Sequence, residues 1–164
     1  AWGGPEKITF DTLLDWTSHA SDGIKYYSGI ATYRNTFDVG VSAEWADTLY
    51  LNLGTVHNIA RVRLNGSDLG IVWTSPWQVK LGDRLKRKEN ILEIEVANTW
   101  VNRLIGDEQP ANKDVRQVKW DNGLLEGKSY PAGRYTFTTY RYYKADMPLA
   151  PSGLLGPVTI QSIW

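Results

Sequence analysis

The chain has 164 residues, 42% of them hydrophobic, and its 18 Lys and Arg residues balance 18 Asp and Glu residues. This length predicts a single domain over residues 1–164, with a hydrophobic core large enough to be stable without disulfides or a structural metal ion. Zero net charge argues against nucleic acid or an anionic membrane surface as the main partner. The absence of cysteine excludes disulfides and thiolate zinc sites. No run reaches the roughly 18 apolar residues of a membrane span. We expect the protein to be a monomer.

The first elements expected along the chain are short. Residues 8–10 are a strand candidate, and residues 11–16 can form a brief helical turn capped by Asp11. Residues 29–37 then alternate between two sets of side chains, which predicts a strand. One face of this strand carries Ala31, Tyr33, Asn35 and Phe37.

The middle of the chain is a series of alternating segments separated by turns. Inward-facing rows are expected at Leu49, Leu51 and Leu53, at Ala60, Val62 and Leu64, and at Leu92, Ile94, Val96 and Asn98. Asn65-Gly66 predicts a type I′ hairpin, because both positions of that turn need positive φ. Further strands are expected at 67–73, 77–81, 134–143 and 158–163. About eight strands without a long helical period predict an all-β antiparallel β-sandwich, and the long connections favour a jelly roll over a meander.

Aromatic and polar residues gather on the connections, including an irregular segment at 100–133 whose first six residues can form a helical turn. Indole faces suit the apolar C–H patches of a sugar ring, and amides and charges suit its hydroxyls. The candidate carbohydrate-binding residues are Trp73, Trp77, Trp100, Asn102, Arg103, Asp107 and Trp120. Two plainer interpretations stay open: each indole can fill a gap in the core, and Arg103 and Asp107 can pair with each other.

Catalytic residues are not predicted for this chain alone. Glycoside hydrolysis needs two carboxyl groups about 5–9 Å apart, facing each other across the sugar. Glu93 and Glu95 repeat at roughly 7 Å on one strand face, yet they lie in one plane, which is typical of a solvated outer surface. If the chain were catalytic, the better candidates are the loop carboxylates Asp107, Glu108 and Asp121.

Metal-binding motifs are also missing from the sequence. His19 and His57 are far apart, and neither has a cysteine or a second histidine nearby. Oxygen donors that suit Ca²⁺ occur without the fixed spacing that marks a site; they are Asp11, Asp15, Asp107, Asp121 and Asn122. We therefore predict no metal ligands and no cofactor, and leave a structural calcium ion open.

Several motifs together resemble a known family. The segments that carry the likeness are 2–6, 27–37, 53–56, 62–66, 69–73, 89–94, 98–107 and 151–158. Val-x-Leu-Asn-Gly at 62–66 is common to many sugar-binding sandwiches, whereas Asn-Arg-Leu-Ile-Gly-Asp at 102–107 and Pro-Ser-Gly-Leu-Leu-Gly-Pro at 151–157 are more specific. Over nearly its whole length the chain resembles the galactose-binding-like jelly-roll domain of family 2-type glycoside hydrolases and of bacterial α-L-rhamnosidase-like proteins.

The resemblance implies a non-catalytic accessory carbohydrate-binding-like domain, excised from the C-terminal part of a larger bacterial glycoside hydrolase that degrades polysaccharide. It implies that the catalytic carboxylates lie on a separate barrel domain, and that the parent is periplasmic, on the cell surface or secreted. The expected partners are carbohydrate, bound weakly, and the catalytic domain of the parent enzyme.

Two alternatives stay open beside this interpretation. A purely structural interdomain module without a ligand predicts a flat apolar patch of several hundred Å². A small autonomous glycoside hydrolase predicts an opposed carboxyl pair in a cleft.

Overall fold

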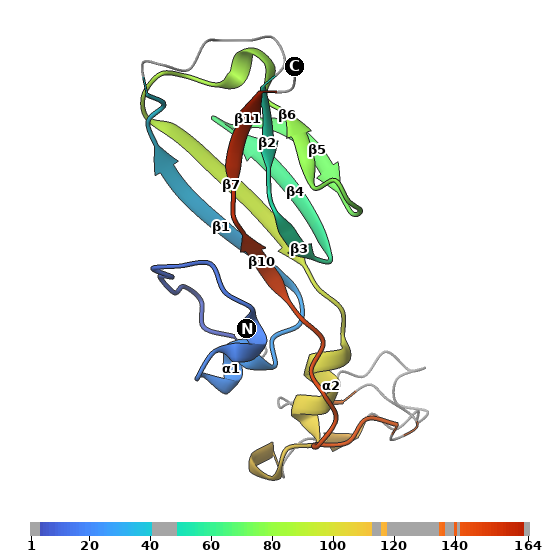
Figure 1. The fold of residues 1–164 in the computed structure, drawn as a ribbon. Coiled ribbons are helices and arrows are strands. Elements are labelled where there is room, and N and C mark those ends of the chain that lie inside the picture. The colour runs from blue at the N-terminus through green and yellow to red at the C-terminus, as the bar shows by residue number, and fades with distance from the viewer. Residues whose placement is uncertain are drawn as a thin grey trace, which may run out of the picture.

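The computed structural model consists of two β layers packed face to face, with short helices gathered at one end (Figure 1). It describes residues 4–40, 49–112, 116–117, 135–136, 140 and 142–162. The larger sheet has four antiparallel strands in the order β1-β7-β4-β5. Their bounds are β1 Ile30–Phe37, β4 Ile59–Leu64, β5 Ser67–Val72 and β7 Asn90–Ala97. The predicted antiparallel β class is confirmed.

The opposite layer is built from two strand paths that run side by side and a third short strand. Their bounds are β2 Leu49–Asn52, β3 Thr55–His57, β6 Gln78–Lys80, β10 Gly153–Gly156 and β11 Thr159–Ser162. β2 leads into β3 and β10 into β11, so the β11-β2-β6 sheet and the β10-β3 pair form one layer. Between β2 and β3, Gly54 has φ 68°, and a Cβ there would collide with the carbonyl of Gly156. The close approach of the two paths therefore requires glycine.

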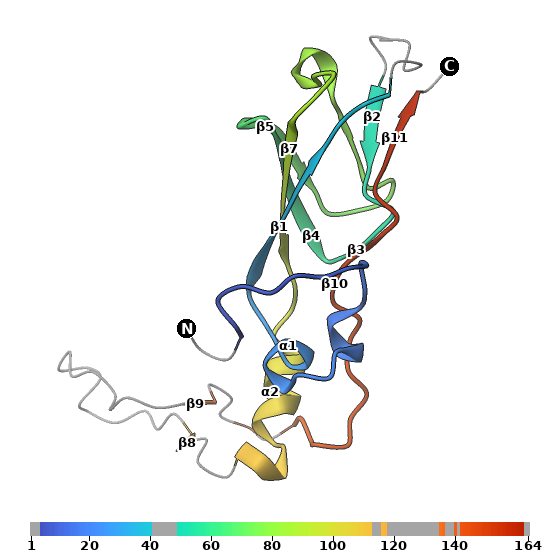
Figure 2. The same ribbon diagram turned by 90° about the vertical axis from the view of Figure 1, so that its left-hand side faces the viewer.

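The helical pieces are short, and both α-helices lie at the end of the sandwich where β7 finishes. They are α1 Asp22–Lys25, α2 Val101–Asp107 and the 3-10 turns η1 Trp16–Ser18, η2 Gly82–Arg84 and η3 Pro110–Asn112. A two-residue parallel pair, β8 Arg116–Gln117 and β9 Tyr135–Thr136, follows η3. Both views place α1 next to α2 below the sheets (Figure 2). Within the described residues, no helix has the length and apolar character needed to cross a membrane.

The core lies between the two layers and follows the predicted alternation. Ala60, Val62 and Leu64 on β4 are each 0% exposed, and the inner row of β7 is also buried. Leucines from β2 belong to the same cluster. Fully burying a side chain of this size is worth about 1.5–3 kcal/mol, so these rows supply much of the stability of the fold.

The Asn65-Gly66 hairpin is confirmed, with φ 53° and 81° at the two turn residues. The helical turn predicted at 100–105 corresponds to α2. Near the N-terminus the predictions are wrong: residues 8–10 form no strand, and the first turn begins at Trp16. Asp15 caps it instead of Asp11, accepting a 2.9 Å hydrogen bond from the amide of Thr17. The strand predicted at 134–143 lies largely outside the described residues.

Candidate functional site

Two of the candidate tryptophans, Trp73 and Trp100, extend from the same end of the four-stranded sheet. Both β5 and β7 are antiparallel to β4, so they run in one direction and finish together. Trp73 comes directly after β5, and Trp100 comes three residues after β7. Their exposed fractions are 73% and 58%, so both indoles offer apolar area to solvent.

Trp77 has a different place, because it packs against the core and is only half-exposed. Its carbonyl accepts a 2.8 Å hydrogen bond from the amide of Leu53, which joins the start of β6 to the end of β2. Trp77 thus fills a gap at the sheet end, the plainer of the two roles that the sequence left open. Trp120 lies outside the described residues.

The amide of Asn102 is used within the protein. The residue is 1% exposed, and its Nδ2 donates to the carbonyl of Ala150 at 2.7 Å and to the Oγ of Ser152 at 2.9 Å. Its Oδ1 accepts from the amide of Ala150 at 2.8 Å. Asn102 therefore fastens α2 to the segment that precedes β10.

Arg103 and Asp107 contact each other along one turn of α2. The Nε of Arg103 lies 3.0 Å from the Oδ1 of Asp107, and both side chains are almost fully buried. The two charges pair, as one interpretation of the sequence expected, but the pair is buried in the helical region and does not lie on the surface, where that interpretation put it.

A polar junction around Ser152, which sequence reasoning missed, ties three distant stretches together. Asn98 donates from Nδ2 to the carbonyl of Tyr27 at 2.8 Å and to the Oγ of Ser152 at 3.2 Å. Its Oδ1 accepts from the amide of Gly29 at 3.0 Å. The amide of Ser152 donates to the Oδ1 of Asp15 at 3.1 Å. The partners are up to 137 residues apart, so no local pattern could have predicted them.

The acidic residues of the sheet's outer face are paired with arginines. Glu95 lies 2.7 Å from Arg63, and Glu93 lies 3.9 Å from Arg34. Asp68 lies 2.6 Å from Arg61, and the hydrogen bond from that guanidinium is the main reason that the pKa of Asp68 is lowered. Glu93 and Glu95 thus occupy the solvated outer surface that the alternation predicts.

The calcium candidates do not gather into one site among the residues that the structure describes. No group of three or more His, Asp or Glu side chains there is placed to hold a metal ion. Asp15 caps η1 and accepts from the amide of Ser152, and Asp107 pairs with Arg103. Asp121 and Asn122 lie outside the described residues.

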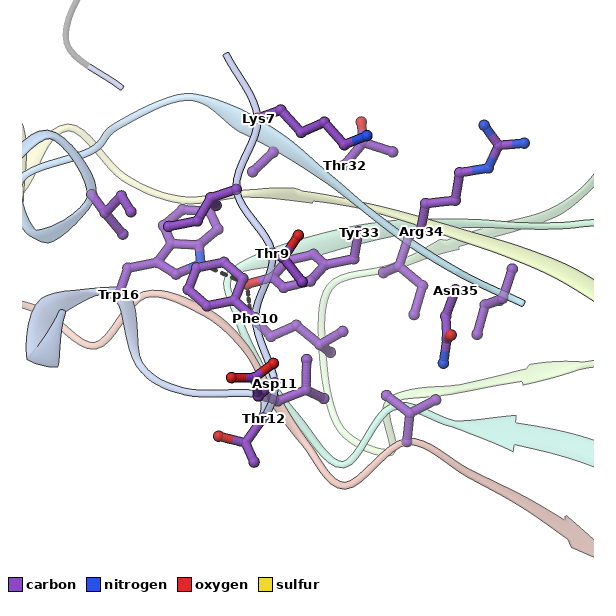
Figure 3. Close-up of a pocket in the computed structure, with 18 of the residues that line it drawn as sticks. Lys7, Thr9, Phe10, Asp11, Thr12, Trp16, Thr32, Tyr33, Arg34 and Asn35 are labelled. Carbon is purple, nitrogen blue, oxygen red and sulfur yellow. Dashed lines mark hydrogen bonds between the residues drawn. The ribbon is translucent and has the colours of Figure 1, made fainter. Parts of the chain in front are cut away.

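A groove of about 1150 Å³ opens between β1, β11 and the N-terminal segment (Figure 3). Phe10 packs on Tyr33 at one end, with 6.3 Å between ring centroids. The hydroxyl of Tyr33 accepts from the Nε1 of Trp16 at 2.5 Å and from the amide of Leu154 at 3.1 Å. Burial raises the pKa of Tyr33. The alternation along 29–37 predicted that Tyr33 faces inward, but not that it remains partly uncovered.

Comparison with known proteins places these features in a family. Residues 18–136 match the family described as glycosyl hydrolase 2 galactose-binding domain-like. The chain belongs to this family. The domain is also 39% identical over 159 residues to the protein named "Putative beta-glucuronidase" from Formosa agariphila, covering 94% of the domain and 14% of that protein. The predicted resemblance is confirmed.

A solved structure agrees with the family assignment. The rhamnosidase from Novosphingobium sp. PP1Y superposes on the domain with a TM-score of 0.78 and 39% sequence identity. The match covers 97% of the domain and 13% of the rhamnosidase chain. The galactose-binding domain-like fold is therefore shown, and the domain spans only about one seventh of the relatives that it matches.

Proposed function

We propose that the domain is a non-catalytic accessory module of a bacterial glycoside hydrolase and binds carbohydrate through Trp73 and Trp100. The observation that carries the proposal is the exposure of both indoles, 73% and 58%, at one end of the same sheet. A sugar ring can lie with its C–H face against an indole face, a contact worth about 1–2 kcal/mol. Two such contacts set at one sheet end suit a saccharide longer than one unit.

Binding through these residues should be weak. The polar candidates that would add directional hydrogen bonds are engaged inside the protein: Asn102 with the segment before β10, and Arg103 with Asp107. Indole stacking alone supports dissociation constants of roughly high micromolar to millimolar. An accessory module of this kind raises the local concentration of a polymer near its enzyme without holding it tightly.

The test is an NMR titration of the ¹⁵N-labelled domain with a panel of neutral and acidic oligosaccharides. We expect the indole N–H resonances of Trp73 and Trp100 to shift together at millimolar sugar, and Trp73→Ala and Trp100→Ala each to weaken binding at least threefold. Ile91→Ala is the matched control, because Ile91 is an exposed apolar residue at the opposite end of the sheet, paired with Thr36. Indole resonances that stay fixed with every sugar would exclude the proposal.

A structural interdomain module is the second candidate, and a specific observation favours it. Three exposed isoleucines lie on the outer face of the four-stranded sheet, towards the end at which β5 and β7 finish. Ile30 and Ile59 both oppose Ala97, and Ile71 opposes Arg61 on the neighbouring strand. Branched aliphatic side chains suit contact with protein better than contact with sugar hydroxyls. The same titration decides between the candidates, since this one expects no sugar-dependent shift.

The parent enzyme and its location belong to the proposal as well. We propose that the parent degrades polysaccharide outside the cytoplasm, in the periplasm, at the cell surface or in the medium, with its catalytic carboxylates on another domain. The small share of each relative that the domain covers, 14% and 13%, supports the placement of the catalytic carboxylates on another domain. Fractionation of the source bacterium with an antibody against the domain tests the location; signal confined to the cytoplasm would contradict it.

A further inference from the structure

We propose that the groove between β1 and β11 receives an extended segment from the rest of the parent polypeptide. In this arrangement the segment pairs with the free edge of β1 and places alternate apolar side chains in the groove. The inference rests on the proposed membership of a larger glycoside hydrolase. It is independent of whether Trp73 and Trp100 bind sugar.

The first observation is that the core is complete at the two central strands of the four-stranded sheet and incomplete at its β1 edge. Inward residues of β4 are 0% exposed, and those of β7, one strand nearer the edge, are also buried. Tyr33 opposes buried Ile94 on β7, and Asn35 opposes buried Leu92. Yet Tyr33 is only partly buried, and Asn35, which faces the same interior, is exposed. One row of the sheet's inner face therefore lacks its cover.

The second observation is the shape and chemistry of the groove. Phe10 of the N-terminal segment closes one end by packing on Tyr33, and Asn35 lies farther along β1 (Figure 3). Its floor includes the buried side chains of Leu51, Leu92 and Ile94. The volume of about 1150 Å³ exceeds the roughly 300–1000 Å³ typical of small-ligand pockets. Although polar side chains such as Lys7 and Thr12 also line the groove, the buried aliphatic side chains of its floor suit hydrophobic side chains of a bound segment better than a sugar.

The third observation is the backbone edge of β1, an end strand of the sheet. The amide of Asn98 donates to the carbonyl of Gly29, and the antiparallel alternation then directs Ala31, Tyr33, Asn35 and Phe37 towards β7. The N–H and C=O groups of Thr32 and Arg34 point the other way. No described strand pairs with that edge. An unpaired edge beside an apolar groove is the geometry used for strand addition.

The occupant follows from how little of its relatives this domain represents. It covers 13% of the similar rhamnosidase and 14% of the similar glucuronidase-named protein, so most of such a polypeptide lies outside the domain. A segment tethered to the domain meets a high effective concentration and needs little intrinsic affinity. The parent chain is therefore the occupant we assign, in preference to a second copy of the domain.

The test is hydrogen–deuterium exchange with residue resolution, comparing the isolated domain with the intact parent enzyme. In the isolated domain we expect the amides of Thr32 and Arg34 to exchange rapidly. In the parent they should exchange at least tenfold more slowly. Equal rates in both proteins would overturn the proposal. Slow exchange already in the isolated domain would also overturn it, because the domain would then cover its own edge; protection that grows with domain concentration would assign the edge to a second copy.

Variants of the parent separate groove filling from edge pairing and from folding. Asn35→Arg places a bulky charge at an exposed position in the groove, and we expect it to remove the protection of Thr32 and Arg34. Ile91→Arg is the matched control, because Ile91 is exposed on the outer face of the same sheet and lies at the end opposite Trp73; it should leave that protection unchanged. Protection that survives Asn35→Arg would refute occupation of the groove. A failed sugar titration would leave these results unaffected, so the two proposals fail separately.

Discussion

The two central strands of the four-stranded sheet and its β1 border differ, although the same alternation builds both. On β4 and β7 the inner rows are sealed against leucines of the opposite layer. On β1 the inner row continues in register with β7 but faces an open groove. Alternation thus decides which side chains point inward, and it carries no information about whether another layer covers them.

The largest expected effect on stability contrasts one residue of the central strands with one residue beside the groove. Leu64→Ala on β4 removes a side chain that is fully buried and should lower the free energy of unfolding by about 3 kcal/mol, because the transfer term and the cavity term add. Ile160→Ala on β11 removes a partly exposed side chain beside the groove and should cost about 1 kcal/mol. Urea denaturation of both variants measures the difference. Equal losses of unfolding free energy would mean that the side chains beside the groove are as well packed as those of the central strands.

The next effect tests whether the polar junction is as complete as the apolar core. Asn102→Ala leaves the amide and carbonyl of Ala150 without their partner and should cost about 2 kcal/mol. Trp100→Ala, two residues earlier and exposed, should change stability by about 0.5 kcal/mol or less. Thermal unfolding followed by circular dichroism compares the two. A larger loss for Trp100→Ala would show that its indole is structural.

A smaller effect is expected where the groove along β1 meets the packed core. The hydroxyl of Tyr33 accepts from Trp16 and Leu154 at the closed end of the groove. Tyr33→Phe removes both hydrogen bonds and should cost about 1–2 kcal/mol, while the rings keep their stacking. Urea denaturation and the indole N–H resonance of Trp16 check this. An unchanged resonance together with an unchanged midpoint would contradict the assigned contacts.

The smallest effect concerns the exposed ion pair of Asp68 and Arg61, which belongs neither to the packed core nor to the groove. Because the hydrogen bond from Arg61 lowers the pKa of Asp68, the pairing stabilises the fold above the ordinary aspartate pKa and is lost as the pH falls through the lowered value. Asp68→Asn should therefore lower thermal stability only slightly at neutral pH, because the pair is exposed, and the difference from the native chain should vanish in acid, where Asp68 itself is protonated. High salt should remove even this difference.

The sequence predicts the parts of this molecule that depend on neighbouring residues. The strand at 29–37, the row on β7 and the Asn65-Gly66 turn all follow from local alternation or local backbone demands. Strands as short as β3 and β10, three and four residues long, carry too little alternation to be recognised. Among the described residues no strand pairs with the segment at 8–10, and Phe10 packs on Tyr33 instead.

The candidate site was harder to predict, because contacts with distant parts of the chain decide which of its residues are buried and which are exposed. Trp73 and Trp77 are four residues apart on one connection, yet only Trp77 meets the core, where its carbonyl is bound by Leu53. Asn102 has the composition of a ligand contact, but its partner Ala150 lies 48 residues later. Residue type therefore predicted where polar and aromatic groups gather, and long-range pairing determined which of them reach solvent.

The strand order has a consequence for how the two proposed activities coexist. β1 forms one border of the four-stranded sheet, and β5, which delivers Trp73, forms the other. Adjacent strands are spaced about 4.8 Å apart, so three intervals separate the borders by roughly 14 Å. A parent segment paired with the first border would leave Trp73 at the second border uncovered, whereas Trp100 follows β7, the strand next to β1, and lies nearer to the anchored border.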